Sequence, residues 1–305
     1  MAFPKWISAL IILPLLLACA GSSQAPTPAP DRPKAIVAIG DSHTFHTSYG
    51  MVMDDFYPAQ LAILINQKGG DVVSRNLGIS GNTTSQMYSR IKDMFEYEIP
   101  TIAVVYGGTN DQLACHQTAV ASPFDTSTKS FLVGSGLGSS FSVGSKISIN
   151  TNEETVVGVA ADVVTIQGSS GYLPAMGDPV VISTKGNLEL IASYLRANGC
   201  SKIIFPNPPY FNWSSGGDTI SVPMPWSVPT RQDESDASLI ESAKYADLYS
   251  TMRNRIINGI DIQGCFSWHV ADQDVHMNRY GNQITAEAIL QTIEDAGWMN
   301  DLIKK

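Results

Sequence analysis

Short, largely apolar runs alternate with segments of helical periodicity along most of this chain. Three such runs, "AIVAIG", "DVVSRNLGI" and "TIAVVYGG", begin at Ala35, Asp71 and Thr101, and helical patterns separate them. Strands that are apolar on both faces need cover on both faces, and helices between successive strands let those strands run parallel. The alternation therefore predicts an α/β fold in which a parallel sheet lies between two layers of helices.

The predicted helices have capping residues and stop signals at their ends. One helix is predicted over "YPAQLAILINQKGG", which stops at Gly69 and Gly70, and a second over "TTSQMYSRIKDMFEYE", with Thr83 or Thr84 as its N-cap. After residue 184 the pattern predicts, in order, a helix over "GNLELIASYLRANG", a strand over "SKIIFPNPPY", a long helix from Ser235 to Gly259, a strand around "CFSWHV" and a closing helix from Arg279 to Gly297. These elements extend the same sheet and its helical layers.

The stretch from Ser122 to Thr184 departs from this alternation. It is rich in Gly, Ser, Thr and Val, its apolar residues alternate as in "SFSVGSKISIN", and no helical pattern interrupts it. We expect a small all-β insert, a barrel or a sandwich, in a loop at one rim of the sheet; an extended β arm of the main domain is the alternative. The predicted domains are a main domain of residues 34–121 and 185–305 and an insert of residues 122–184.

The first residues have the pattern of an export signal. One cation, Lys5, precedes an apolar run from Trp6 to Ala18, which is too short to span a bilayer as a helix. The junction before Cys19 resembles a bacterial lipobox, so we expect a signal peptide of residues 1–18, a lipidated Cys19 and a flexible tether of residues 19–33. These features predict a lipid-anchored protein of the bacterial cell envelope, periplasmic or at the outer membrane. An ordinary cleaved signal and a secreted protein are the alternative.

Charge and cysteine content narrow the possible functions. The 19 Lys and Arg residues against 28 Asp and Glu residues give a net charge of −9, which argues against a nucleic-acid-binding surface. Beyond Cys19 the chain has Cys115, Cys200 and Cys265, which cannot all pair and do not have the spacing of a zinc site. Buried thiols and a single disulfide bridge are both open.

Polar clusters that contain glycine or aspartate follow the predicted strands. Ser42 follows the first strand, Gly81 the second, Asn110 the third and His276 the last. The carboxyl ends of parallel strands share one rim of a sheet, so these residues are expected to converge there. Each cluster alone also suits a turn or a helix cap, whereas together they supply what acyl transfer needs. The Ser42 hydroxyl would be the nucleophile and His276 its base. The backbone N–H groups of Ser42 and Gly81, with the Asn110 amide, would stabilise the oxyanion.

The blocks "GDSHT", "GISGNTT", "GGTND" and "DQDVHMN", in this order, resemble those of the GDSL or SGNH ester hydrolases. The resemblance covers essentially the whole mature chain except the tether and the insert, and it implies a flavodoxin-like three-layer α/β/α fold. It also implies hydrolysis through an acyl-enzyme, without a metal or an organic cofactor. By the same resemblance Ser42 is the nucleophile and His276 the base. Gly81 and Asn110 then match the family's oxyanion donors.

One position departs from the family's pattern. The family usually places an Asp three residues before the His, and this chain has Gln273 there, between Asp272 and Asp274. A neutral side chain could orient the imidazole but would not stabilise the imidazolium that forms during attack. We therefore expect one of the two carboxylates, with Asp272 preferred, to orient His276. A Ser–His dyad is the alternative.

The sequence thus predicts a serine ester hydrolase for short acyl esters, carried by a small molecule or present as O-acetyl groups on a glycan. An acyltransferase that uses the same site is one alternative. The other is a non-catalytic envelope adhesin in which the insert binds a glycan or a protein.

Overall fold

The computed structural model describes residues 33–45, 50–96, 98–112, 117–208, 232–233, 235–238, 243–257 and 276–303. These residues belong to one compact unit, Pro33–Lys305. The predicted signal peptide, the predicted lipidation site Cys19, nearly all of the predicted tether and the strand predicted around "CFSWHV" lie outside the described residues. No helix within the described part of the chain is long and apolar enough to cross a membrane.

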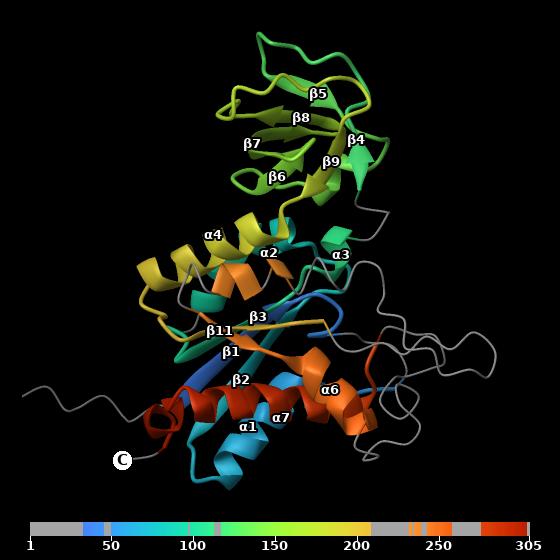
Figure 1. Cartoon of the computed structure of the whole chain (residues 1–305). Helices are drawn as coiled ribbons and strands as arrows, with labels where there is room; N and C mark the ends of the chain where they lie inside the picture. Colours follow the sequence, from blue (N-terminus) through green and yellow to red (C-terminus); the bar gives the residue numbers. More distant parts are fainter. Residues whose placement is uncertain are drawn as a thin grey trace, which may run out of the picture. The chain divides into compact units, whose positions relative to one another are not determined.

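Five strands form a parallel sheet, as the alternation predicts. They are β1 (Lys34–Gly40), β2 (Val72–Gly78), β3 (Ile102–Tyr106), β10 (Ile203–Pro206) and β11 (Lys244–Ala246). Their order is β11-β10-β3-β1-β2, and every neighbouring pair is parallel. Figure 1 shows the strands of this sheet between α2 and α4 on one side and α1 and α7 on the other. β1 therefore lies inside the sheet, with its carboxyl end beside those of β2 and β3.

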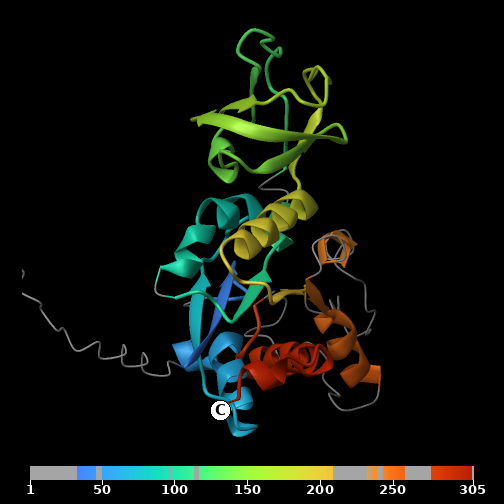
Figure 2. The ribbon, with the colours of Figure 1, turned by 90° about the vertical axis from the view of Figure 1, so that its left-hand side faces the viewer.

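The two faces of this sheet have separate apolar cores. The helices are α1 (Tyr57–Gln67), α2 (Thr84–Ser89), α3 (Thr109–Gln112), α4 (Thr184–Ala197), α6 (Leu248–Ile257) and α7 (Arg279–Asp295), with 3-10 turns η1 (Met53–Asp55) and η5 (Trp298–Asp301). Ile36 and Ala38 of β1 pack in one core with α1, α6 and α7. Val37 and Ile39 point to the opposite face and pack with α2 and α4. Figure 2 shows α4 (yellow) and α7 (red) on opposite sides of the sheet. The three-layer α/β/α fold expected from the sequence is confirmed.

The helix predicted from Ser235 to Gly259 is wrong, because a strand interrupts it. β11 occupies Lys244–Ala246, where Tyr245 pairs with Phe205 of β10, and helix α6 begins at Leu248. This pairing joins distant parts of the sequence, so the local helical periodicity gave no sign of it. β11 forms the edge of the sheet next to β10.

The second predicted helix is shorter than its periodic pattern. α2 ends at Ser89, the backbone has φ −113° at Arg90, and the 3-10 helix η2 (Ile91–Phe95) follows. Thr83 is the N-cap, in agreement with the prediction: its hydroxyl accepts a hydrogen bond from the Gln86 N–H at 3.3 Å. The Gln86 side chain returns this contact by accepting from the Thr83 N–H at 3.0 Å.

A second sheet, of six antiparallel strands, forms between α3 and α4. Its strands are β4 (Thr118–Ala119), β5 (Ser130–Leu132), β6 (Lys146–Ile149), β7 (Asn152–Ala160), β8 (Val163–Ile166) and β9 (Pro179–Ile182), in the order β4-β9-β6-β7-β8-β5, with a 3-10 turn η3 (Gly138–Ser140) after β5. The sheet curves so that its first and last strands come together. The Ala121 N–H, just after β4, donates to the carbonyl of Leu132 in β5 at 2.7 Å. It has the form of a small barrel, which begins at Thr118, before the predicted Ser122 (Figure 1).

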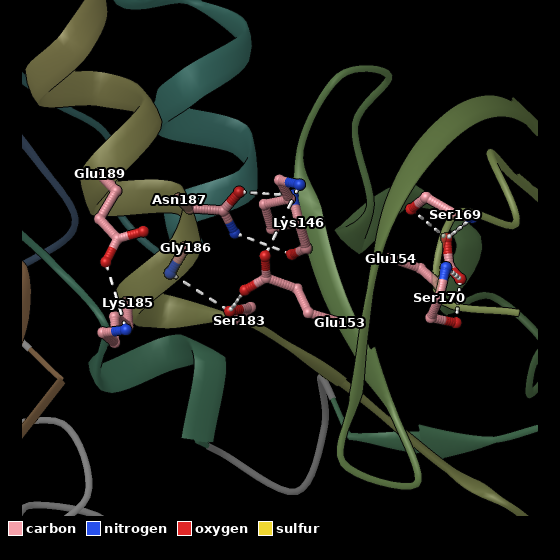
Figure 3. Close-up of polar contacts among 10 residues, drawn as sticks. All are labelled: Lys146, Glu153, Glu154, Ser169, Ser170, Ser183, Lys185, Gly186, Asn187 and Glu189. Carbon is pink, nitrogen blue, oxygen red and sulfur yellow. Dashed lines mark hydrogen bonds and ion pairs between the residues drawn. The ribbon is translucent and has the colours of Figure 1, made fainter. Parts of the chain in front are cut away.

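The barrel has an apolar core of its own and polar contacts with α4. Its core residues belong to neither core of the parallel sheet. The Asn187 side chain of α4 accepts from the Lys146 N–H at 2.7 Å and donates to the Lys146 carbonyl at 3.1 Å (Figure 3). The Ser183 hydroxyl caps α4 by accepting from the Gly186 N–H at 3.2 Å, and it donates to Glu153 of β7 at 3.0 Å. Strands β6 and β7 of the barrel are therefore both hydrogen-bonded to the start of α4, the helix that follows β9.

Candidate functional site

Three of the predicted site residues lie at the carboxyl ends of neighbouring strands. Ser42 is half-buried in the turn after β1, Gly81 is exposed in the turn after β2, and Asn110 lies in α3, just after β3. The Asn110 side chain is buried, with 8% of its surface exposed. Because β1 lies between β2 and β3, the turn that contains Ser42 lies between the other two.

The Asn110 side chain connects these turns. Its amide nitrogen Nδ2 donates one hydrogen bond to the Asn82 carbonyl at 3.0 Å and a longer one to Oδ2 of Asp41 at 3.3 Å. Asn82 directly follows Gly81, and Asp41 directly precedes Ser42. One amide therefore holds the turns after β1 and β2 against the residue that follows β3.

Two main-chain N–H groups at this rim, those of Ser42 and Gly81, have no acceptor among the described residues. Gly81 has φ +79°, a left-handed conformation that favours glycine. Apart from Gly81 and its two neighbours in the chain, no atom lies within 4 Å of the position that a β-carbon of Gly81 would occupy, so the space beside this residue is open. Since the described fold does not use these two N–H groups, they are available to an oxygen of a ligand.

His276 reaches the same rim from the distant end of the chain. It is half-buried just before α7, and its ring centroid lies 6.3 Å from that of His43, the residue after Ser42. The His43 ring stacks on Tyr106 at the end of β3, with 5.4 Å between the centroids. The structure thus brings the predicted base to the turn of the predicted nucleophile.

The predicted orienting carboxylates, Asp272 and Asp274, lie outside the described residues, as do Cys115 and Cys265. Cys200 is a free thiol, and burial raises its pKa to about 11. Within the described ranges, no three His, Cys, Asp or Glu side chains gather in a way that could hold a metal ion.

Two buried carboxyl groups flank the candidate oxyanion donors. Burial raises the pKa of Asp41 to about 7, although a hydrogen bond from the His43 N–H at 2.9 Å favours the ionised form. Burial also raises the pKa of Asp111 to about 7, against hydrogen bonds from Thr84 and Thr184. Asp111 accepts from the Thr84 N–H and from the Thr184 hydroxyl, each at 2.8 Å. It therefore joins the first turn of α2 to the first turn of α4.

Replacing Asp111 with Asn is expected to weaken the pH dependence of stability between about pH 4 and pH 7. Because the folded-state pKa is raised, the stabilisation from Asp111 is fully present below the unfolded pKa of 3.8 and is lost as the pH rises to about 7. Asn keeps the shape of the side chain and does not ionise. Urea unfolding at about pH 4 and about pH 8 should therefore show a smaller drop in the free energy of unfolding for the variant than for the wild type.

Asp162→Asn is the matched control for this measurement. Hydrogen bonds from the N–H groups of Gly136 and Gly138 lower the pKa of Asp162, so its contribution changes with pH only below its unfolded value. This variant should alter stability equally at the two pH values. If the free energy of unfolding dropped equally between the two pH values in Asp111→Asn and in the wild type, Asp111 would not be the titrating group.

No role for Asp111 or Arg90 is predicted from the sequence, and the structure places both residues at this rim. Asp111 had a local signal, since it follows Asn110 in the polar cluster after the third strand. Arg90 had none, because the helical pattern continues through it, whereas the structure ends α2 at Ser89.

Comparisons with known proteins agree with this architecture. The profile of the GDSL-like lipase/acylhydrolase family matches residues 38–284. A lipase/acylhydrolase from Enterococcus faecalis has a similar structure over 86% of this chain and 96% of its own, with 17% identity and a TM-score of 0.51. A catalytic mutant of an acetylxylan esterase from Geobacillus stearothermophilus is similar over 86% of this chain and 94% of its own, with 14% identity and a TM-score of 0.51. A search of curated proteins found no match. The two structural similarities show a shared fold.

Proposed function

Because this chain belongs to the GDSL-like lipase/acylhydrolase family, we propose that it cleaves short-chain carboxylic esters through an acyl-enzyme on Ser42. The observation that supports the proposal most is the pair of hydrogen bonds from Asn110 Nδ2, to Asn82 and to Asp41. These bonds connect the turns of Ser42 and Gly81 to Asn110, and the three residues supply the proposed nucleophile and the three proposed donors for an oxyanion. Acyl transfer needs this combination, with a base in reach of the nucleophile.

In the proposed reaction, Ser42 Oγ attacks the acyl carbonyl carbon while His276 takes the hydroxyl proton. The carbonyl oxygen becomes an oxyanion, which accepts hydrogen bonds from the N–H groups of Ser42 and Gly81 and from Asn110 Nδ2. Collapse of the tetrahedral intermediate breaks the ester bond, and the leaving alcohol takes the proton from His276. Water then attacks the acyl-enzyme by the same route, which releases the acid and restores Ser42.

The base is proposed to be oriented by Asp272 or Asp274. Asp272 is preferred, since a small adjustment of the loop would let a carboxylate next to the family's usual position reach His276. A negative charge there would stabilise the imidazolium that forms as Ser42 loses its proton.

The substrate class is proposed to be short acyl esters, with O-acetyl groups on a glycan as the leading example. The acetylxylan esterase with a similar structure is named for such a group, and only its fold is shared with this chain. An envelope location would bring the enzyme to such glycans. We propose that location, with lipidation of Cys19, from the signal-like pattern of residues 1–18 and the lipobox-like junction before Cys19.

The proposal is tested by supplying the full chain with p-nitrophenyl esters of graded acyl length, and with acetylated polysaccharides, in the presence of a metal chelator. We expect turnover that is fastest for the acetate ester. An alkyl fluorophosphonate should label Ser42, as identified by peptide mass spectrometry. Labelling of a different residue would contradict the assigned nucleophile.

Three other outcomes identify the alternatives. Transfer of acetyl groups to an added glycan in place of water would identify an acyltransferase at the same site. Binding of a glycan without turnover of any ester would identify an adhesin. Fastest turnover of long-chain esters would overturn the substrate class and leave the mechanism in place.

A further inference from the structure

The Arg90 side chain donates three hydrogen bonds at the candidate site, each to an uncharged acceptor. Nε donates to Oδ1 of Asn82 at 2.7 Å, Nη1 to the Leu77 carbonyl at 2.6 Å and Nη2 to the Gly40 carbonyl at 2.9 Å. Gly40 ends β1, and Leu77 lies near the end of β2. A single guanidinium therefore joins the ends of two neighbouring strands to the turn that follows the second one.

These bonds form a closed ring with Asn110. From Gly40 the ring runs through Arg90 to the Asn82 side chain, and from the Asn82 carbonyl to Asn110 Nδ2 at 3.0 Å. Asn110 then returns to Asp41, which follows Gly40, at 3.3 Å. The ring includes Asp41, which directly precedes the predicted nucleophile, and Asn82, which directly follows Gly81. Arg90 enters it from beyond the end of α2.

The charge of Arg90 is not used in an ion pair with any described residue. Partial burial lowers its pKa to about 10, which still leaves the guanidinium protonated at neutral pH. A planar guanidinium presents several donors in fixed directions, whereas a lysine ammonium acts as a single point. Arg90 donates to three acceptors at set positions, and none of them is a carboxylate. These contacts indicate that Arg90 fixes the relative positions of the strand ends and the turn at this rim.

Gly81 needs support from its neighbours, because glycine does not restrict its own backbone. On one side, the Ile79 N–H donates to the Gly40 carbonyl at 3.0 Å. On the other side, Asn82 is held by Arg90 and by Asn110. An oxyanion donor is effective only when its N–H already points to the place where charge develops. The contacts on both sides of Gly81 therefore contribute to the direction of its N–H.

We infer that Arg90 is a positioning residue that holds the turn of Gly81 and Asn82 so that the Gly81 N–H and the Asn110 amide are directed at the oxyanion. The inference rests on the function proposed above. Arg90 itself makes no contact with the substrate in this scheme, and its effect passes through Asn82.

Arg90→Met removes the three donors at similar side-chain length, and Arg90→Lys keeps the charge. We expect kcat for p-nitrophenyl acetate to fall about 10-fold in Arg90→Met, with KM within about threefold, because an oxyanion hole acts mainly in the transition state. Arg90→Lys should recover part of the loss. A boronic acid, which forms a tetrahedral adduct with a serine nucleophile, should lose affinity by a factor similar to the loss in kcat.

Arg75→Gln is the matched control, since Arg75 lies in β2 and its Nε contacts Glu98, which is not a member of the ring, at 3.0 Å. It should keep kcat and boronate affinity. Asn82→Ala is the second variant, because it removes the acceptor of Arg90 Nε alone. In the double variant with Arg90→Met, kcat should fall no further than in Arg90→Met itself.

Hydrogen exchange of the peptide over residues 77–84 separates this inference from the proposed function, because it does not need turnover. Faster exchange in Arg90→Met than in the wild type and in Arg75→Gln is the expected result. Unchanged exchange, or kcat and boronate affinity within about twofold of the wild type, would overturn the inference. If the wild type cleaves no ester while residues 77–84 still exchange faster in Arg90→Met than in the wild type, the proposed function is overturned. The role of Arg90 in fixing this turn would then still be established.

Discussion

Replacing Ser42 with Ala is expected to lower kcat for p-nitrophenyl acetate by at least about 10³-fold. Without the hydroxyl no acyl-enzyme forms, so the remaining route is attack by water beside His276 and the oxyanion donors. A low residual rate is therefore expected in place of complete loss. Steady-state kinetics measures the change, and labelling by the fluorophosphonate, which needs the hydroxyl, should disappear in the same variant.

This variant should keep its fold, which makes the kinetic result interpretable. Ser42 is half-buried, and no described residue forms a hydrogen bond with its hydroxyl. The free energy of unfolding should change by less than about 1 kcal/mol. Ser89→Ala is the control, since Ser89 is exposed and its hydroxyl donates to the Gln86 carbonyl at 2.7 Å. Turnover by Ser42→Ala equal to that of this control would remove Ser42 from the mechanism.

The positions of Ser42, Gly81 and Asn110 could be predicted because the sequence marks strand ends locally. An apolar run that stops at glycine and polar residues defines the end of a strand, and a parallel sheet brings such ends to one rim. The observed order, with β1 between β2 and β3, places these three residues as that argument requires. The chemical roles proposed for these residues rest on their type, and the variants test them.

Arg90 and β11 could not be predicted, for a shared physical reason. The helical pattern over residues 83–98 continues past Ser89, yet α2 ends there and Arg90 reaches the carbonyl of Gly40, which is 50 residues away in the sequence. β11 is a strand of three residues, Lys244–Ala246, that pairs with β10. Contacts with distant residues decide both, and tertiary contacts override local preference.

The predicted start of the insert, Ser122, lies after the observed start of the barrel at Thr118. Contact with distant residues again explains the difference. β4 has two residues, and it is defined by antiparallel pairing of Thr118 with Val180 of β9. A pair of residues shows no alternation, so the composition change at Ser122 was the first visible mark of the insert. The β-rich character of the insert, in contrast, could be predicted because β6, β7 and β8 alternate along several residues.

Replacing Asn110 with Ala is expected to lower kcat by about 10²–10³-fold with little change in KM. In the proposed reaction the Asn110 amide is held in place by one contact and donates to the oxyanion in place of another. Each of its two hydrogen bonds corresponds to one of these roles. The 3.0 Å bond to the Asn82 carbonyl orients the amide, whereas the longer 3.3 Å contact with Asp41 is the one that an oxyanion would replace. Asn110→Asp should be at least as slow, because a carboxylate there would repel the oxyanion.

Asn207→Ala separates catalysis from stability in this comparison. Asn207 is also a buried asparagine just beyond the end of a parallel strand, and its amide donates to the Tyr245 hydroxyl at 2.7 Å and to Asp247 at 2.9 Å. Its loss should lower the free energy of unfolding by about 1–3 kcal/mol and leave kcat of the folded enzyme within about threefold. If Asn110→Ala behaves like this control, losing stability but not kcat, then Asn110 holds the turns together without acting on the oxyanion. A selective loss of kcat and of boronate affinity is the result that the proposed mechanism requires.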